Sequence, residues 1–201
     1  MKKSKILACI LSAMVLTSCL ATPALAANPA KQETKQEIQN ATIVKEVKKD
    51  LPSNDPNVIQ KDQIITTYSD GTEIIDTLTV TESPTQTRSA SKRVRAEHSK
   101  DVKRGSSGVV ARFFLNAEFE YNVQAQTVIR TGYSKKYTLE PGYTLGHYDL
   151  EVDTGAGGAW WKPWANVTGK YFFYLTAGQG LFSNGGTLEL KCDSDGHIER
   201  K

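Results

Sequence analysis

The sequence has few cysteines, and their positions argue against a disulfide in the folded protein. Cys9 and Cys19 lie in the first 26 residues, which have the features of an export signal, so removal of that segment leaves only Cys192. An intrachain disulfide is then excluded, although exported proteins have an oxidising compartment available to them. We therefore expect the folded part to be stabilised by its hydrophobic core.

The chain also lacks a large excess of charge of one sign. It has 25 basic and 22 acidic residues, and three of the basic ones are lysines in the first 26 residues, so the remainder is balanced. A neutral chain does not have the strong basic field that nucleic-acid binding requires. The composition therefore predicts no nucleic-acid partner.

The first 26 residues predict a signal peptide. Lys2, Lys3 and Lys5 precede an apolar run over residues 6–20, and Ala24-Leu25-Ala26 places small residues at the spacing of a signal-peptidase site. The apolar run is short for a membrane span. We expect a secreted, extracellular protein.

One alternative for the leader stays open. Leu16-Thr17-Ser18-Cys19 resembles the site at which bacterial lipoproteins are cut and acylated. Lipidation of Cys19 would anchor the protein at the outer face of the cell membrane. The bulky Leu20 and the complete site ending at Ala26 favour soluble release.

Aromatic residues are absent from residues 27–60. The 3 Trp, 8 Tyr and 6 Phe all lie between Tyr68 and Phe182. A charged segment without large apolar side chains cannot offset the entropy lost on ordering. We predict a disordered polar linker over residues 27–61 and one folded domain over residues 62–201.

No stretch of this domain has the apolar stripe of a helix, whereas alternation with a period of two recurs. It is clearest over residues 109–123, where Phe113, Leu115 and Phe119 are separated by mostly polar residues. Further strands are predicted at 64–68, 72–80, 126–133, 143–152, 165–176, 186–192 and 197–200. This pattern predicts an all-β fold, a single antiparallel β-sandwich, with a barrel as the alternative.

Two turn motifs carry a resemblance to known proteins. They are Tyr68-Ser69-Asp70-Gly71-Thr72, followed by Leu78-Thr79-Val80, and the closing segment from Leu188 to Gly196, which ends in Asp193-Ser194-Asp195-Gly196. Both resemble features of small exported β-rich proteins of Gram-positive bacteria that carry no assigned activity. The resemblance implies no functional residues.

The three tryptophans are the main candidates for ligand contact. Trp160, Trp161 and Trp164 follow a glycine-rich segment at 155–158. Indole faces on a loop suit stacking on sugar rings or insertion into a membrane interface. The structural alternative is that adjacent Trp160 and Trp161 point to opposite faces of a strand, so that at least one is in the core.

Residues 88–104 are locally basic and supply two weaker candidates, Arg93 and Arg95. They could contact an anionic wall polymer or lipid headgroups. The alternation of Arg93-Val94-Arg95-Ala96-Glu97 favours a structural interpretation, an exposed edge strand protected by charge.

No residue pattern predicts catalysis, a metal site or a cofactor. His147, Asp149, Glu151 and Asp153 share one strand face, but their spacing suits a solvated face better than a metal site. Cys192 and His197 lack an orienting third group, and Cys192 is expected to be a buried apolar residue.

These observations predict a non-enzymatic extracellular binding or surface module. Its ligand is unknown, with cell-wall glycan or a membrane surface as the candidate partners of the tryptophan-rich loop. A secreted antagonist or toxin-like membrane-active protein is the alternative, and a cell-wall hydrolase has less support.

Overall fold

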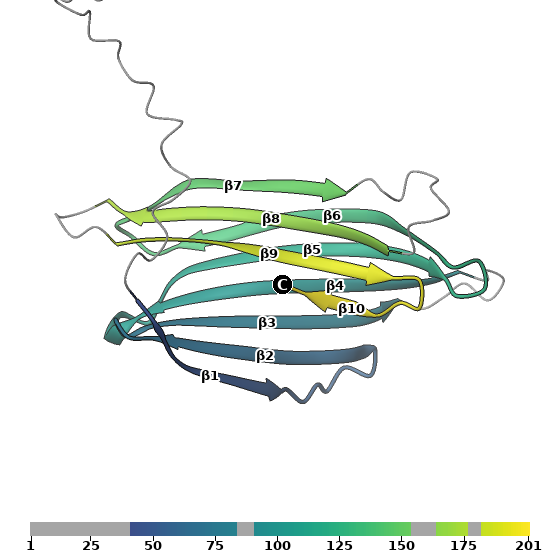
Figure 1. Cartoon of the computed structure of the whole chain (residues 1–201), viewed down its shortest axis with the longest axis horizontal. Coiled ribbons are helices and arrows are strands. Elements are labelled where there is room, and N and C mark those ends of the chain that lie inside the picture. Colours follow the sequence, from purple (N-terminus) through teal and green to yellow (C-terminus); the bar gives the residue numbers. More distant parts are fainter. Residues whose placement is uncertain (1–40, 84–90, 154–163, 177–181) are drawn as a thin grey trace, which may run out of the picture. The chain divides into compact units, whose positions relative to one another are not determined.

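The described part of the chain consists of ten β-strands and contains no α-helix (Figure 1). The computed structural model describes residues 41–83, 91–153, 164–176 and 182–201, which all belong to one compact unit. The strands are β1 (Ile43–Asp50), β2 (Val58–Tyr68), β3 (Thr72–Ser83), β4 (Lys92–Arg104), β5 (Val109–Asn122), β6 (Thr127–Leu139), β7 (Tyr143–Asp153), β8 (Trp164–Leu175), β9 (Ser183–Asp193) and β10 (Ile198–Arg200). A short 3-10 turn, η2 (Gly105–Ser107), joins β4 to β5.

Strands that follow one another in the chain pair antiparallel, except β6 and β7, which belong to different sheets. The large sheet has the order β1-β2-β3-β4-β5-β6, and the small sheet has the order β10-β9-β8-β7. The small sheet packs over β4, β5 and β6 (Figure 1). The predicted antiparallel β-sandwich is confirmed, and the sheets stay separate rather than closing into the alternative barrel.

The core lies between the sheets and consists of every second residue of the central strands. On β5, Phe113, Leu115 and Phe119 are fully buried, as the alternation predicted. The ring of Phe113 stacks on Tyr171 of the small sheet, with centroids 4.0 Å apart. Burial of one such side chain stabilises a fold by about 1.5–3 kcal/mol, so interdigitating side chains are sufficient to hold the sheets together.

The N-terminal boundary of the domain differs from the prediction. β1 and the first residues of β2 fall within 27–61, the segment predicted to be a disordered linker. β1 is an edge strand whose backbone pairs with β2, and every side chain on it except Val47 is exposed. Because such a strand buries little side-chain area, its composition resembles that of a linker. Residues 27–40 lie outside the described part.

The position of β4 also differs from the prediction. Alternation at Arg93 to Glu97 suggested an edge strand, but β4 pairs with β3 on one side and with β5 on the other. Its faces are as expected, with Val94 and Ala96 buried and both arginines outside. Side-chain alternation reports the two faces of a strand, whereas the neighbours of its backbone depend on the whole sheet.

Two predicted turns are confirmed. Gly71 closes the β2–β3 hairpin with φ +80°, and Gly196 closes the β9–β10 hairpin with φ +84°. In the second turn Asp193 Oδ1 accepts hydrogen bonds from the backbone N–H groups of Asp195 and His197, each at 2.9 Å. Positive φ is a conformation that glycine adopts at little cost.

Candidate functional site

Arg93 and Arg95, the predicted electrostatic contacts, lie on the outer face of the large sheet. Arg93 Nη2 is 2.9 Å from Glu120 Oε2, and Arg95 Nε donates a hydrogen bond of 2.8 Å to Glu118 Oε1. Both arginine side chains are 63% exposed. Each guanidinium already has a carboxylate partner on β5, so neither presents an isolated positive charge.

Arg95 also lines a shallow groove of about 300 Å³ between β5 and β6. The register of these two strands shifts between Glu118 and Phe119, which separates the strands locally. The remaining lining residues are Asn116, Ala117, Glu118, Gly132, Tyr133 and Ser134. This groove is small, its lining mixes polar and apolar side chains, and it belongs to the large sheet.

Trp164 lies on the other side of the sandwich. It is the first residue of β8 and pairs with Asp193, while the next residue, Ala165, points into the core. Lys191 Nζ lies 5.6 Å from the centroid of the indole. The structure therefore does not bring Trp164 together with the two arginines. Trp160, Trp161 and Cys19 lie outside the described residues.

Three rings lie beside one another on the outer face of the small sheet, and we call them the aromatic row. They are His147 on β7 and Phe172 and Tyr174 on β8. The centroids of His147 and Phe172 are 5.9 Å apart with planes at 18°, and those of Phe172 and Tyr174 are 6.2 Å apart with planes at 36°. Tyr174 is 38% exposed and the other two are half-buried. The row therefore groups three rings on the outer face of the small sheet.

Glycines on both neighbouring strands make room for the aromatic row. A Cβ at Gly146 would lie 2.5 Å from Phe172 Cδ1, and one at Gly185 would lie 3.3 Å from Cδ2 of the same ring. Phe172 therefore covers glycine backbone, a known way to stabilise a sheet. The rings of His147 and Tyr174 are not among the atoms nearest to either glycine, so this role does not account for them.

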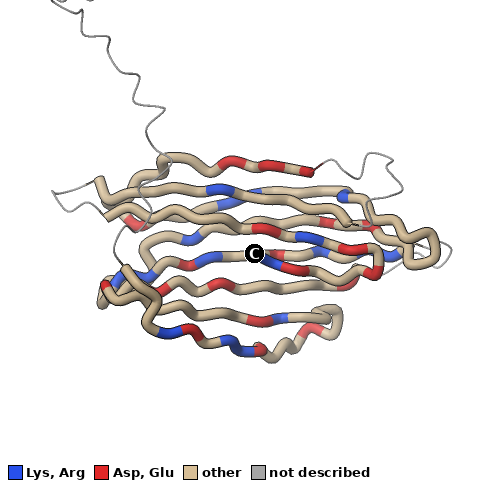
Figure 2. Tube along the Cα trace, in the orientation of Figure 1, with Lys and Arg blue, Asp and Glu red and all other residues tan. Residues whose placement is uncertain are grey.

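The predicted polar row on β7 faces solvent beside these rings. Asp149 and Glu151 are exposed, whereas Tyr148 between His147 and Asp149 is buried. Acidic residues recur along β7 in Figure 2. Glu151 is 2.6 Å from Lys170 Nζ. Within the described ranges, no three His, Cys, Asp or Glu side chains are grouped so that they could hold a metal ion.

A network of charged side chains between the sheets was missed by the sequence analysis. Asp76 Oδ1 lies 2.9 Å from His98 Nε2 and 3.2 Å from Arg200 Nε. Asp76 Oδ2 lies 3.2 Å from Lys100 Nζ, and Arg200 Nη2 lies 2.6 Å from Asp62 Oδ1. His98 is fully buried, and the other four side chains are at most 16% exposed.

This network is a structural element, because its charges are paired and its histidine is closed to solvent. Burial alone would raise the pKa of Asp76, but the hydrogen bond from His98 and the charges of His98, Lys100 and Arg200 lower it overall. The sequence did contain a signal for this network. A spacing of two places His98 and Lys100 on the same face of β4 as Ala96 and Val102, which is the buried face.

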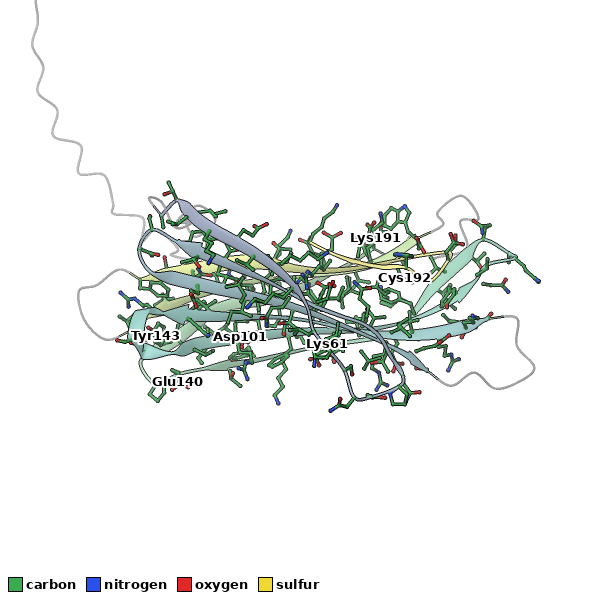
Figure 3. All side chains as sticks on the ribbon, turned by 90° about the horizontal axis from the view of Figure 1, so that it is seen from below. Lys61, Asp101, Glu140, Tyr143, Lys191 and Cys192 are labelled. Atoms are coloured by element: carbon green, nitrogen blue, oxygen red, sulfur yellow. The ribbon has the colours of Figure 1, made fainter. Side chains whose placement is uncertain are left out.

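Cys192 is buried in the core, as predicted. It is 0% exposed on β9, next to Lys191, which faces outward (Figure 3). Burial raises the pKa of its thiol to about 12, so the thiol stays protonated and unreactive. His197 is exposed in the following turn, and the geometry of a catalytic pair is absent here.

The fold and this surface define an antiparallel β-sandwich that carries an aromatic row on one outer face. No protein-family model matches the chain, and neither a curated protein nor a solved structure shows significant similarity to it. Among the described residues no helix has the length and apolar character needed to cross a membrane.

Proposed function

We propose that this protein is a non-enzymatic extracellular binding module that holds a cell-wall glycan against the aromatic row. The supporting observation is the arrangement of His147, Phe172 and Tyr174 as three adjoining rings on the outer face of a sheet. Sugar rings have apolar C–H faces that pack on aromatic rings, and these side chains provide large contact areas at a low cost in rotamer entropy.

Trp164 extends this surface along β8. It lies at the start of the strand, and Phe172 lies outward on the same strand eight positions later. At about 3.3 Å per residue the two positions are about 26 Å apart. A polymer can contact both, whereas a single sugar cannot. Trp160 and Trp161 come shortly before Trp164 in the sequence and remain predicted contacts.

Retention of the full chain on insoluble cell-wall glycan tests the proposal. Replacing both His147 and Tyr174 with alanine should weaken retention at least fivefold, because each packed ring contributes about 0.5–1.5 kcal/mol. The matched control is Phe114→Ala, which removes a half-buried ring from the outer face of the large sheet. Near-UV circular dichroism checks that both variants stay folded. Equal retention of the double variant and the wild type would contradict the proposal.

The same preparations distinguish the two alternatives. Dye release from lipid vesicles, lost on changing the tryptophans, would favour the membrane-active antagonist. Release of soluble fragments from purified wall glycan would favour the hydrolase. Binding without either release supports the binding module.

A further inference from the structure

The outer face of the small sheet is acidic, and its charge restricts the chemistry of a ligand. Among the described residues its outward positions carry Asp149, Glu151, Asp153, Glu189, Asp193 and Glu199, against Lys170, Lys191 and Lys201. The acidic residues of β7 follow one edge of this sheet in Figure 2. A ligand with a high density of phosphate or carboxylate would be repelled by this face.

Asp149 is the carboxylate best placed to reach a ligand on the aromatic row. It is two residues beyond His147 on the same face of β7, and its partner across the strands is Lys170, two residues before Phe172. Same-face neighbours are about 5 Å apart across strands and about 6–7 Å apart along a strand. A sugar packed on Phe172 therefore lies next to this carboxylate.

The carboxylate of Asp149 has no ion-pair partner in the described part of the chain, and its side chain is exposed. Its cross-strand partner, Lys170, is bound to Glu151 instead, at 2.6 Å. An exposed carboxylate beside a row of rings matches a ligand that combines an apolar ring face with a positive charge.

We propose that the aromatic row binds a polymer of amino sugars whose amines are free. The sugar rings pack on Phe172 and Tyr174, and an ammonium group lies against Asp149. This inference rests on the proposed glycan-binding function and specifies the ligand of the same site. The ammonium group gains from the carboxylate and from the π-faces of the rings, and the remaining acidic side chains favour a cationic chain over an anionic one.

The test compares retention of the full chain on three insoluble polymers: N-acetylglucosamine polymer, the same polymer after deacetylation, and a phosphate-bearing wall polymer. Retention should be strongest on the deacetylated polymer and should fall as salt is added. Asp149→Asn should weaken that retention about two- to fivefold and leave retention on the acetylated polymer unchanged. Glu97→Gln is the control, because it removes one exposed negative charge from the outer face of the large sheet.

The outcomes separate this inference from the proposed function. Equal or stronger retention on the acetylated or phosphate-bearing polymer overturns the amino-sugar inference but keeps the binding module. An Asp149→Asn variant that behaves like Glu97→Gln overturns the assignment of Asp149. Failure to bind any of the three polymers or whole wall glycan counts against both.

Discussion

His98 Nε2 lies 2.9 Å from Asp76 Oδ1, and the other ring nitrogen of His98 lies 3.1 Å from the carbonyl oxygen of Glu189. Each ring nitrogen of His98 therefore faces an oxygen, one on a carboxylate and one on a backbone carbonyl. His98 belongs to β4 and Glu189 to β9. The buried His98 side chain therefore joins the two sheets, and Asp76 is its carboxylate partner.

Replacing Asp76 with asparagine should destabilise the fold strongly. The substitution leaves His98, Lys100 and Arg200 with one fewer buried negative charge, and removing one partner of a buried ion pair costs about 3–5 kcal/mol. Urea unfolding measures the change. The control is Asp101→Asn, which breaks the more exposed pair with Arg112 and should cost about 1 kcal/mol or less. Equal losses in the two variants would show that the buried network has no special role.

Acid should remove the contribution of Asp76. Its pKa is lowered in the folded protein from the ordinary value of 3.8, so the stabilisation is present above that value and is lost as the pH falls through the folded pKa. The difference in unfolding free energy between wild type and Asp76→Asn should therefore shrink between neutral pH and about pH 2. A difference that stays constant over this range would contradict the prediction.

The turn at Gly196 should be more sensitive than the turn at Gly71. Both glycines have positive φ, +84° and +80°, but a Cβ at Gly196 would overlap the ring of Tyr121, whereas one at Gly71 meets nothing within 4 Å. Gly71→Ala should cost about 1–2 kcal/mol through backbone strain alone. Gly196→Ala should cost about 1–3 kcal/mol more, because Tyr121 must move. Thermal unfolding compares the two variants, and equal costs would mean that the ring gives way freely.

Cys192 should resist thiol reagents in the folded protein. Its side chain is 0% exposed, and burial raises its pKa to about 12, so both access and thiolate formation are suppressed. Peptide mass spectrometry after brief alkylation distinguishes Cys192 from the other cysteines. Modification should be complete in denaturant and negligible without it; rapid labelling of the native protein would be inconsistent with a closed core.

Much of the fold could be predicted from local patterns. The alternation around Phe113 correctly assigned the two faces of β5, and the glycines at 71 and 196 marked two turns. β1 could not be found in this way, because an edge strand is defined by its backbone pairing and not by buried side chains. Backbone pairing also decides that β4 is an interior strand, and the side-chain alternation that suggested an edge does not report it.

The candidate site was predictable only in part. The shared face of His147 and Asp149 follows from their spacing of two, and Trp164 was selected as a candidate for ligand contact. Phe172 and Tyr174 were not selected, because their proximity to His147 depends on the register of β7 with β8. That register includes a shift between Leu145 and His147, which spacing within one strand does not reveal.

The order of side chains along the chain was sufficient to predict an all-β fold with an apolar interior, because strand faces follow from local geometry, whereas the choice of sandwich over barrel came from the structure. Only the tertiary structure decided which charges meet. Asp62 and Arg200, whose side chains pair in the interior, are 138 residues apart in sequence. Their contact exists because the two sheets stack in one relative position. That position depends on the packing of the whole core.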